Sequence, residues 1–182
     1  MPRIPVVATK EALPAEHHAV WDSIVASRGR VAGPWPVMLH VPPIAGMVAH
    51  LGALLRFDLP LPGAIREMVI LVTVREVKCA SEWAAHAPLA RKEGVSEQTI
   101  AAIREGRAPE GLTPEEAEYA TFALQVVRKH RVDEATFQKL EQRLGQQGLL
   151  ELTALVGYYC LIGTVLDAFE VEPPPGSETL PE

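Results

Sequence analysis

The sequence predicts an all-α protein, and three observations carry that prediction. Apolar residues recur at intervals of three and four along most of the chain, which is the periodicity of an amphipathic helix. Proline, glycine and capping residues stand where such helices would begin and end. The one segment rich in branched apolar residues, 68–74, finds no partner strand elsewhere in the sequence, and a lone strand leaves its backbone groups unpaired.

The composition is that of one ordinary globular domain. Of the 182 residues, 48% are hydrophobic and 22% charged, enough to form a core without metal or disulfide cross-links. The formal net charge of −6 and the lack of a Lys and Arg cluster argue against a nucleic-acid partner. The longest unbroken apolar run, 68–72, is far shorter than a membrane span, and the first residues lack the apolar stretch of a secretory signal. We therefore expect a cytoplasmic protein with no membrane partner.

The predicted helical domain covers residues 1–170. Residues 1–10 form an irregular lead, and residues 171–182, with three consecutive prolines, predict a flexible tail. The first helix begins after Pro14 and ends at Gly29. A connection broken by prolines then leads to a second helix, whose apolar stripe consists of Ile44, Met47, Val48, Leu51, Leu54 and Leu55.

The second half of the chain continues this pattern. Residues 64–77 predict a buried helix. Ser96 begins a short helix, Thr113 opens a capping box ahead of the next, and Asp133 caps a third. The last helix, residues 149–169, is apolar nearly all round, which predicts contact with other subunits as well as with the core. We therefore expect the chain to self-associate.

A cysteine, a glutamate and a histidine recur at helical spacing in the stretch EVKCASEWAAH, residues 76–86. Intervals of three and four residues place Cys79, Glu82 and His86 on one face of a helix. An imidazole can act as a general base, a carboxylate can orient it or carry the proton, and a thiol beside them can become nucleophilic. The same spacing also suits an exposed Glu–His pair beside an inert cysteine, so two interpretations stand.

A family resemblance favours the catalytic interpretation. The stretch IREMVILVTVREVKCASEWAAHAPLARKEGV, residues 65–95, resembles the carboxymuconolactone decarboxylase superfamily, which includes the alkylhydroperoxidase D-like (AhpD-like) proteins. The hydroperoxidase branch carries a glutamate, eleven residues and then Cys-x-x-Cys-x-x-x-His, which Glu67, Cys79 and His86 match. Glu82 stands in place of the second cysteine. The decarboxylase branch has a glutamate four residues before the histidine, as Glu82 is before His86.

The resemblance implies a fold, an assembly and a function. The fold would be an AhpD-like bundle of about seven to eight helices, in agreement with the helical periodicity, assembled into a homotrimer or hexamer. The function would be that of a carboxymuconolactone decarboxylase-like enzyme without a cofactor, in which His86 and Glu82 move protons during decarboxylation or isomerisation of a small carboxylated lactone or ring acid.

Two alternatives remain open. The first is a thiol-dependent hydroperoxide reductase that uses Cys79 with an external resolving thiol. The second is a non-catalytic binding or assembly protein that keeps the fold. A metal at Cys79, Glu82 and His86 is not expected, because the sequence shows no fourth ligand.

The position of Glu67 poses a geometric question. In one straight helix Glu67 and Cys79 would lie about 18 Å apart. We therefore expect the chain to break near residues 76–78, with Glu67 directed toward His86 through a water molecule. The alternative is an ion pair between Glu67 and a neighbouring arginine. A substrate carboxylate would need a cationic group, and the candidates are Arg56, Arg66 and Arg75.

Overall fold

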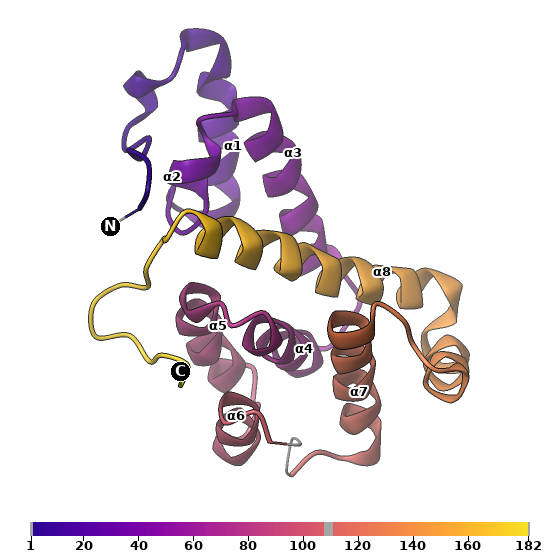
Figure 1. Ribbon diagram of the computed structural model, residues 1–182. Helices are drawn as coiled ribbons and strands as arrows, with labels where there is room; N and C mark the ends of the chain where they lie inside the picture. Colours follow the sequence, from indigo (N-terminus) through magenta and orange to yellow (C-terminus); the bar gives the residue numbers. More distant parts are fainter. Residues whose placement is uncertain (1, 108–110, 182) are drawn as a thin grey trace. The chain divides into compact units, whose positions relative to one another are not determined.

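The computed structural model describes residues 2–107 and 111–181, and it confirms the all-α prediction. Within those ranges there are no strands and eight α-helices: α1 (His18–Arg28), α2 (Trp35–Met38), α3 (Pro42–Ala53), α4 (Gly63–Glu76), α5 (Ala80–Lys92), α6 (Glu97–Arg104), α7 (Pro114–Lys129) and α8 (Glu134–Ala168) (Figure 1). Two 3₁₀ turns, η1 (Lys10–Ala12) and η2 (Ala15–His17), precede α1, and a π-helical turn, η3 (Leu54–Asp58), follows α3.

The chain divides into two compact units. Unit 1 contains the residues up to Leu59 together with Val165–Glu172, and unit 2 contains Pro60–Thr164 together with the residues from Pro173 onward. The assignment of residues 1–170 to a single domain stays a prediction. All the sequence-predicted site residues lie in unit 2.

In unit 1, α3 packs against α1 and α2 with its small side chains. Ala45, Ala49 and Gly52 are buried, so the helices approach closely along this face. The larger apolar residues of the predicted stripe lie on the other side of α3: Ile44 is 53% exposed and Met47 is 76% exposed. The predicted helix is confirmed, but four of the six residues of its apolar stripe are exposed in the single chain, while Leu55 is buried. Self-association stays a prediction.

In unit 2, α4 is the central helix and packs against α5, α6 and α7. Nine of its residues are buried, from Ile65 to Val74, which confirms the helical interpretation of this apolar segment. The predicted capping box is present at the start of α7, where the Thr113 hydroxyl accepts from the Glu116 amide and the Glu116 carboxylate accepts from the Thr113 amide. Ser96 caps α6 by accepting a hydrogen bond from the Thr99 amide.

The last helix contains a break that matches the two helices predicted from the sequence. Gly145 has φ 67° and ψ 176°, so the helical backbone is interrupted there. Asp133 caps the first segment through the Thr136 amide, at 2.8 Å. Among the described residues, α8 is the one helix whose length and composition would suit a membrane span, and 50% of its most apolar window is buried. A buried core helix meets the same criteria.

The C-terminal residues contact α5 and α6 in unit 2. The Glu178 carboxylate pairs with Arg91 at 2.8 Å and lies 3.4 Å from the indole nitrogen of Trp83. Arg104 donates to the Thr179 carbonyl at 2.8 Å. Tail flexibility stays a prediction, because such exposed ion pairs contribute little to stability.

Candidate active site

The turn between α4 and α5 brings the candidate residues together. α4 ends at Glu76, Lys78 adopts the left-handed conformation with φ 61°, and Cys79 is the residue before the first turn of α5. The Cys79 amide donates to the Val74 carbonyl at 2.9 Å, which closes the turn. The predicted chain break is therefore confirmed, and it lets α5 fold back along α4.

Glu67 and His86 form a direct hydrogen bond across these two helices. Glu67 Oε2 and His86 Nδ1 lie 2.7 Å apart although the residues are 19 positions apart in the chain. The two side chains are each 4% exposed. The predicted approach of Glu67 to His86 is present, but the expected intervening water is wrong, because 2.7 Å leaves no space for one.

The second nitrogen of the same imidazole faces Glu82. His86 Nε2 and Glu82 Oε2 lie 3.4 Å apart, one turn of α5 from each other. Both ring nitrogens of His86 therefore face carboxylates. Only an imidazolium has two N–H groups to direct toward both carboxylates at once.

This arrangement determines the protonation of His86. Burial acts most strongly and lowers the pKa of the imidazole, but the hydrogen bonds to Glu67 and Glu82, together with their charges, raise the pKa above its ordinary value. The two carboxylates therefore favour the protonated form of the ring. The role of general base suggested by the sequence stays a prediction, and the raised pKa also suits a role as proton donor.

Arg66 adds a second positive charge to the cluster formed by Glu67, Glu82 and His86. Its Nε lies 3.7 Å from Glu67 Oε1, the carboxylate oxygen that does not contact His86. This Nε is buried and has no hydrogen-bond partner among the described residues. With His86 protonated, the two glutamates, the imidazolium and the guanidinium sum to zero charge. A buried donor without an acceptor is unusual and is typical of a position where a ligand or water oxygen binds.

The other two arginine candidates are differently placed. Arg75 donates through Nε at 2.8 Å to the carbonyl of Arg104, the last residue of α6. Arg56 belongs to unit 1, where its guanidinium lies 5.1 Å from the centre of the Phe57 ring. Of the three arginines proposed from the sequence, Arg66 is the one in contact with the Glu67–His86 pair.

Cys79 lies at the N-terminal end of α5 and is fully buried, at 0% exposure. Gly163 of α8 approaches it closely: a Cβ at position 163 would lie 3.3 Å from Cys79 Cβ and 3.9 Å from its Sγ. A helix N-terminus favours a thiolate. Both ring nitrogens of His86 face carboxylates.

Tyr159 of α8 belongs to the site and was not proposed from the sequence. Its ring meets the His86 ring edge to face, with centroids 4.9 Å apart and planes at 88°. It is 1% exposed, so the contact fixes the plane of the imidazole within the packed interior. The sequence places Tyr159 in a helix that is apolar nearly all round, and no local signal distinguishes it from the other core residues.

No group of three or more His, Cys, Asp and Glu side chains in the described part of the chain is arranged to hold a metal ion. The sequence offered Cys79, Glu82 and His86 as three residues of metal-ligand type. In the structure the two ring nitrogens of His86 face the carboxylates of Glu67 and Glu82. The groups present are those of proton transfer and of thiol chemistry.

The sequence profile of the carboxymuconolactone decarboxylase family matches residues 42–125, a range that contains all four candidate residues. The whole fold is found in AhpD-like structures as well. The family match and the AhpD-like fold together support the resemblance of this chain to the carboxymuconolactone decarboxylase and AhpD-like superfamily. The resemblance first noted on the motif around Cys79 and His86 is thereby confirmed.

Three solved structures show how far the likeness of fold extends. An uncharacterized peroxidase-related protein from Ralstonia eutropha JMP134, with an alkylhydroperoxidase AhpD core, has a TM-score of 0.79 at 20% identity, covering 96% of this chain and 93% of that one. An uncharacterized peroxidase-related protein from Silicibacter sp. TM1040 has a TM-score of 0.74 at 16% identity, covering 97% of this chain and 95% of that one. The debrominase Bmp8 has a TM-score of 0.76 at 13% identity, covering 95% of this chain and 92% of that one. No curated protein matches the sequence.

Proposed function

We propose that this protein is a cofactor-free acid–base enzyme that decarboxylates a small carboxylated lactone or a related ring acid. The observation that carries the proposal is the buried imidazole held between two carboxylates, Glu67 at 2.7 Å and Glu82 at 3.4 Å. A buried, hydrogen-bonded group whose pKa is shifted by specific charge partners is typical of acid–base sites.

In the proposed reaction the bond between the ring carbon and its carboxylate breaks. Carbon dioxide leaves, and the electron pair passes into the ring as an enolate. The His86 imidazolium donates a proton to this anion, so the carboxylate group is replaced by hydrogen. Solvent returns the proton through Glu82, whose side chain is 11% exposed, compared with 4% for His86.

Arg66 would contact the substrate, because its buried Nε has a donor to offer and no acceptor among the described residues. A substrate oxygen at this position would receive a charge-assisted hydrogen bond. Tyr159 would hold the imidazole plane while the proton moves, because its ring packs edge to face against His86.

The test is turnover of a panel of carboxylated lactones by purified protein, measured as carbon dioxide release. We expect His86→Gln to lower kcat by roughly 100-fold or more. Cys79→Ser should keep activity within about tenfold, because the thiol takes no part in this reaction. Glu16→Gln is the matched control, since Glu16 is exposed and lies in unit 1. Equal turnover by wild type and His86→Gln contradicts the proposal.

A second candidate function is thiol-dependent peroxide reduction, and the position of Cys79 at the N-terminus of α5 favours it. Solved structures with this fold include two proteins described as peroxidase-related. The Cys79 thiolate would attack the peroxide, break its O–O bond and become a sulfenic acid, while the alcohol leaves with a proton. An external thiol would then form a mixed disulfide with release of water, and a second would restore Cys79.

The two candidates are separated by hydroperoxide consumption in the presence of a dithiol. Cys79→Ser abolishes this activity if the second candidate is correct. Cys160→Ser is the matched control, because burial raises the pKa of the Cys160 thiol and no acidic or basic partner offsets it. If wild type, Cys79→Ser and His86→Gln behave alike in both assays, the third function, a non-catalytic binding protein, is the one that remains.

A further inference from the structure

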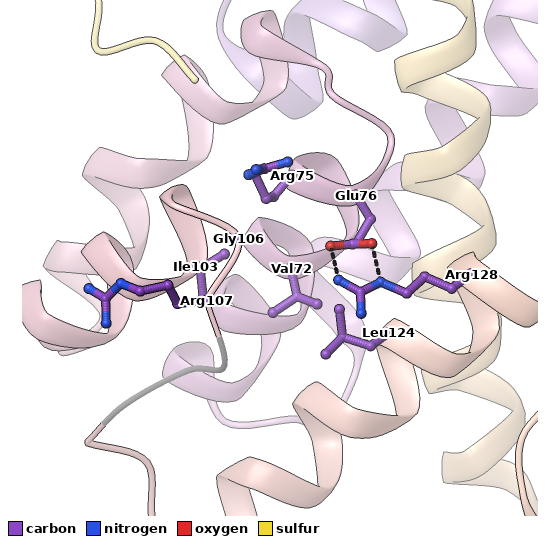
Figure 2. Close-up of a pocket in the computed structure, with 8 residues that line it drawn as sticks. All are labelled: Val72, Arg75, Glu76, Ile103, Gly106, Arg107, Leu124 and Arg128. Carbon is purple, nitrogen blue, oxygen red and sulfur yellow. Dashed lines mark hydrogen bonds and ion pairs between the residues drawn. The ribbon is translucent and has the colours of Figure 1, made fainter. Parts of the chain in front are cut away.

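Unit 2 contains a cavity away from the Glu67–His86 pair, between α4, the turn after α6, and α7. Its volume is about 170 Å³ (Figure 2). The residues that line it are Val72, Arg75, Glu76, Ile103, Gly106, Arg107, Leu124 and Arg128. Arg75 is eight residues beyond Glu67 on α4, a rise of about 12 Å along the helix, so this cavity is distinct from the candidate active site.

Two of its three arginines are already paired. Arg128 donates to Glu76 through two nitrogens, and the Nη2–Oε1 distance is 2.8 Å. The dashed lines in Figure 2 mark this pair at one side of the cavity. Arg107 donates to Glu105 at 2.7 Å, and its guanidinium is directed away from Glu76. Neither guanidinium therefore brings an unbalanced charge into the cavity.

Arg75 is the arginine that no described carboxylate balances. Its Nε donates to the Arg104 carbonyl at 2.8 Å, which orients the guanidinium without neutralising it. Gly106 lies directly beside it with φ 69°, and a Cβ there would come within 2.7 Å of Arg75 Nη2. The absence of a side chain at position 106 thus makes room for the guanidinium. Arg75 is held in place with its charge uncompensated.

The rest of the lining is apolar. Val72, Ile103 and Leu124 supply aliphatic side chains from three different elements. An apolar cavity of about 150 Å³ is large enough to take a benzene ring. The lining therefore combines space for a small ring or short chain with one cation that can form a planar, two-pronged contact with a carboxylate.

We propose that this cavity is a second ligand site, which binds a small organic carboxylate with its anionic group on Arg75 and its apolar body against Val72, Ile103 and Leu124. The site is separate from the proposed catalytic cluster. Its existence does not depend on which reaction that cluster performs.

Benzoate is the probe, and benzamide is its uncharged counterpart of the same shape. We expect isothermal titration calorimetry to give a Kd on the order of 1 mM for benzoate and no measurable binding of benzamide. Arg75→Gln should weaken benzoate binding by roughly ten- to hundredfold, the effect of losing one charge-assisted contact. Glu16→Gln, an exposed change in unit 1, and His86→Gln, in the other cluster, should leave the Kd unchanged.

A second measurement keeps the test decisive if Arg75→Gln fails to fold. In wild-type protein labelled with ¹⁵N, benzoate should shift the Arg75 Nε–H resonance and leave that of Arg66 unmoved. The Arg75→Lys variant lacks the guanidinium, so the resonance that disappears from its spectrum is the one of Arg75. The proposal is overturned if benzoate does not bind, if it binds Arg75→Gln as it binds wild type, or if His86→Gln abolishes binding, which would place the probe in the catalytic cluster.

Discussion

The substitution Glu67→Gln tests the protonation of His86 most directly. It keeps the size of the side chain and one hydrogen-bond acceptor for His86 Nδ1, but it removes the charge 2.7 Å from that nitrogen. Breaking a buried ion pair by removing one partner costs about 3–5 kcal/mol. Because glutamine still accepts the hydrogen bond, and because His86 can release its proton, we expect a loss of about 2–4 kcal/mol in the free energy of unfolding at mildly acidic pH.

The size of this loss should depend on pH. In the wild type the folded-state pKa of His86 is raised, so its protonation stabilises the fold fully below the unfolded-state pKa of about 6.5 and loses that effect as the pH rises through the folded-state value. In Glu67→Gln burial still lowers the pKa, while one of the two carboxylates that raise it is gone. The gap in stability between wild type and variant should therefore be widest near pH 5.5 and narrow to about 1 kcal/mol or less near pH 8.5.

Urea unfolding followed by circular dichroism at the two pH values measures this gap. An NMR titration of the His86 ring should show its pKa falling in Glu67→Gln. Glu16→Gln makes the same chemical change at an exposed carboxylate and should alter stability by less than about 0.5 kcal/mol at both pH values. A gap of equal size at both pH values, with an unchanged His86 titration, refutes the conclusion that Glu67 holds the imidazole in its protonated form.

Three further substitutions test the local structure around the site. Lys78→Gly should stabilise the protein by about 0.5–1 kcal/mol, since Lys78 is exposed and has φ 61°; an unchanged or lower urea midpoint would contradict this. Gly163→Ala should cost about 1–3 kcal/mol, because the added methyl group would lie 2.9 Å from Val77 Cγ2 and 3.3 Å from Cys79 Cβ. Gly157→Ala, with no atom within 4 Å of the added group, should be neutral or mildly stabilising. Equal urea midpoints for the two variants would show that the packing of Gly163 against Val77 and Cys79 is not tight. Thr113→Ala should lower the free energy of unfolding by about 1 kcal/mol, because the capping box of α7 is lost. Thermal unfolding measures this change. Thr113→Ser keeps the hydroxyl group and should have a smaller effect; an equal effect would contradict the role of the hydroxyl.

Two features predicted from the sequence are confirmed, one from a local signal and one from the sequence as a whole. Thr113 and Glu116 form a capping box because the two residues stand three apart, and this interaction needs nothing from the rest of the chain. The assignment of residues 68–74 to a helix rather than a strand rested on the absence of partner strands, which is a property of the whole sequence. Both predictions are confirmed because no distant contact competes with them.

The burial pattern of α3 shows where periodicity falls short. Both faces of this helix carry apolar residues, so the sequence does not indicate which one packs against α1 and α2. The face that packs is the one with the smaller side chains, Ala45, Ala49 and Gly52, because small residues let helix axes approach closely. Ile44 and Met47, the stronger hydrophobic signal, remain exposed in the single chain.

The candidate site was predictable only in part, because some of its contacts join segments that are far apart in the sequence. Glu82 and His86 lie on one turn of a helix, and their proximity follows from their spacing. The contact between Glu67 and His86 depends on the turn at Lys78, where a lysine adopts a conformation that ordinarily favours glycine or asparagine. Tyr159 reaches His86 from α8, more than 70 residues away along the chain, by a contact that no short motif records.

Glu82 is the residue that most strongly favours acid–base chemistry over thiol chemistry. With a second cysteine in its place, the imidazolium and Arg66 would carry one positive charge more than Glu67 balances, and a Cys79 thiolate would be compensated. With Glu82 present the cluster is already neutral, so a thiolate would add a buried negative charge at a cost of several kcal/mol. In the proposed decarboxylation the substrate carboxylate brings the same single negative charge, but the buried Nε of Arg66 offers it a hydrogen-bond donor. That charge remains on the cluster when His86 gives up its proton and neutral carbon dioxide departs, until solvent returns the proton. In the proposed reaction Glu82, which stands where the hydroperoxidase motif has its second cysteine, would act as the proton relay to solvent.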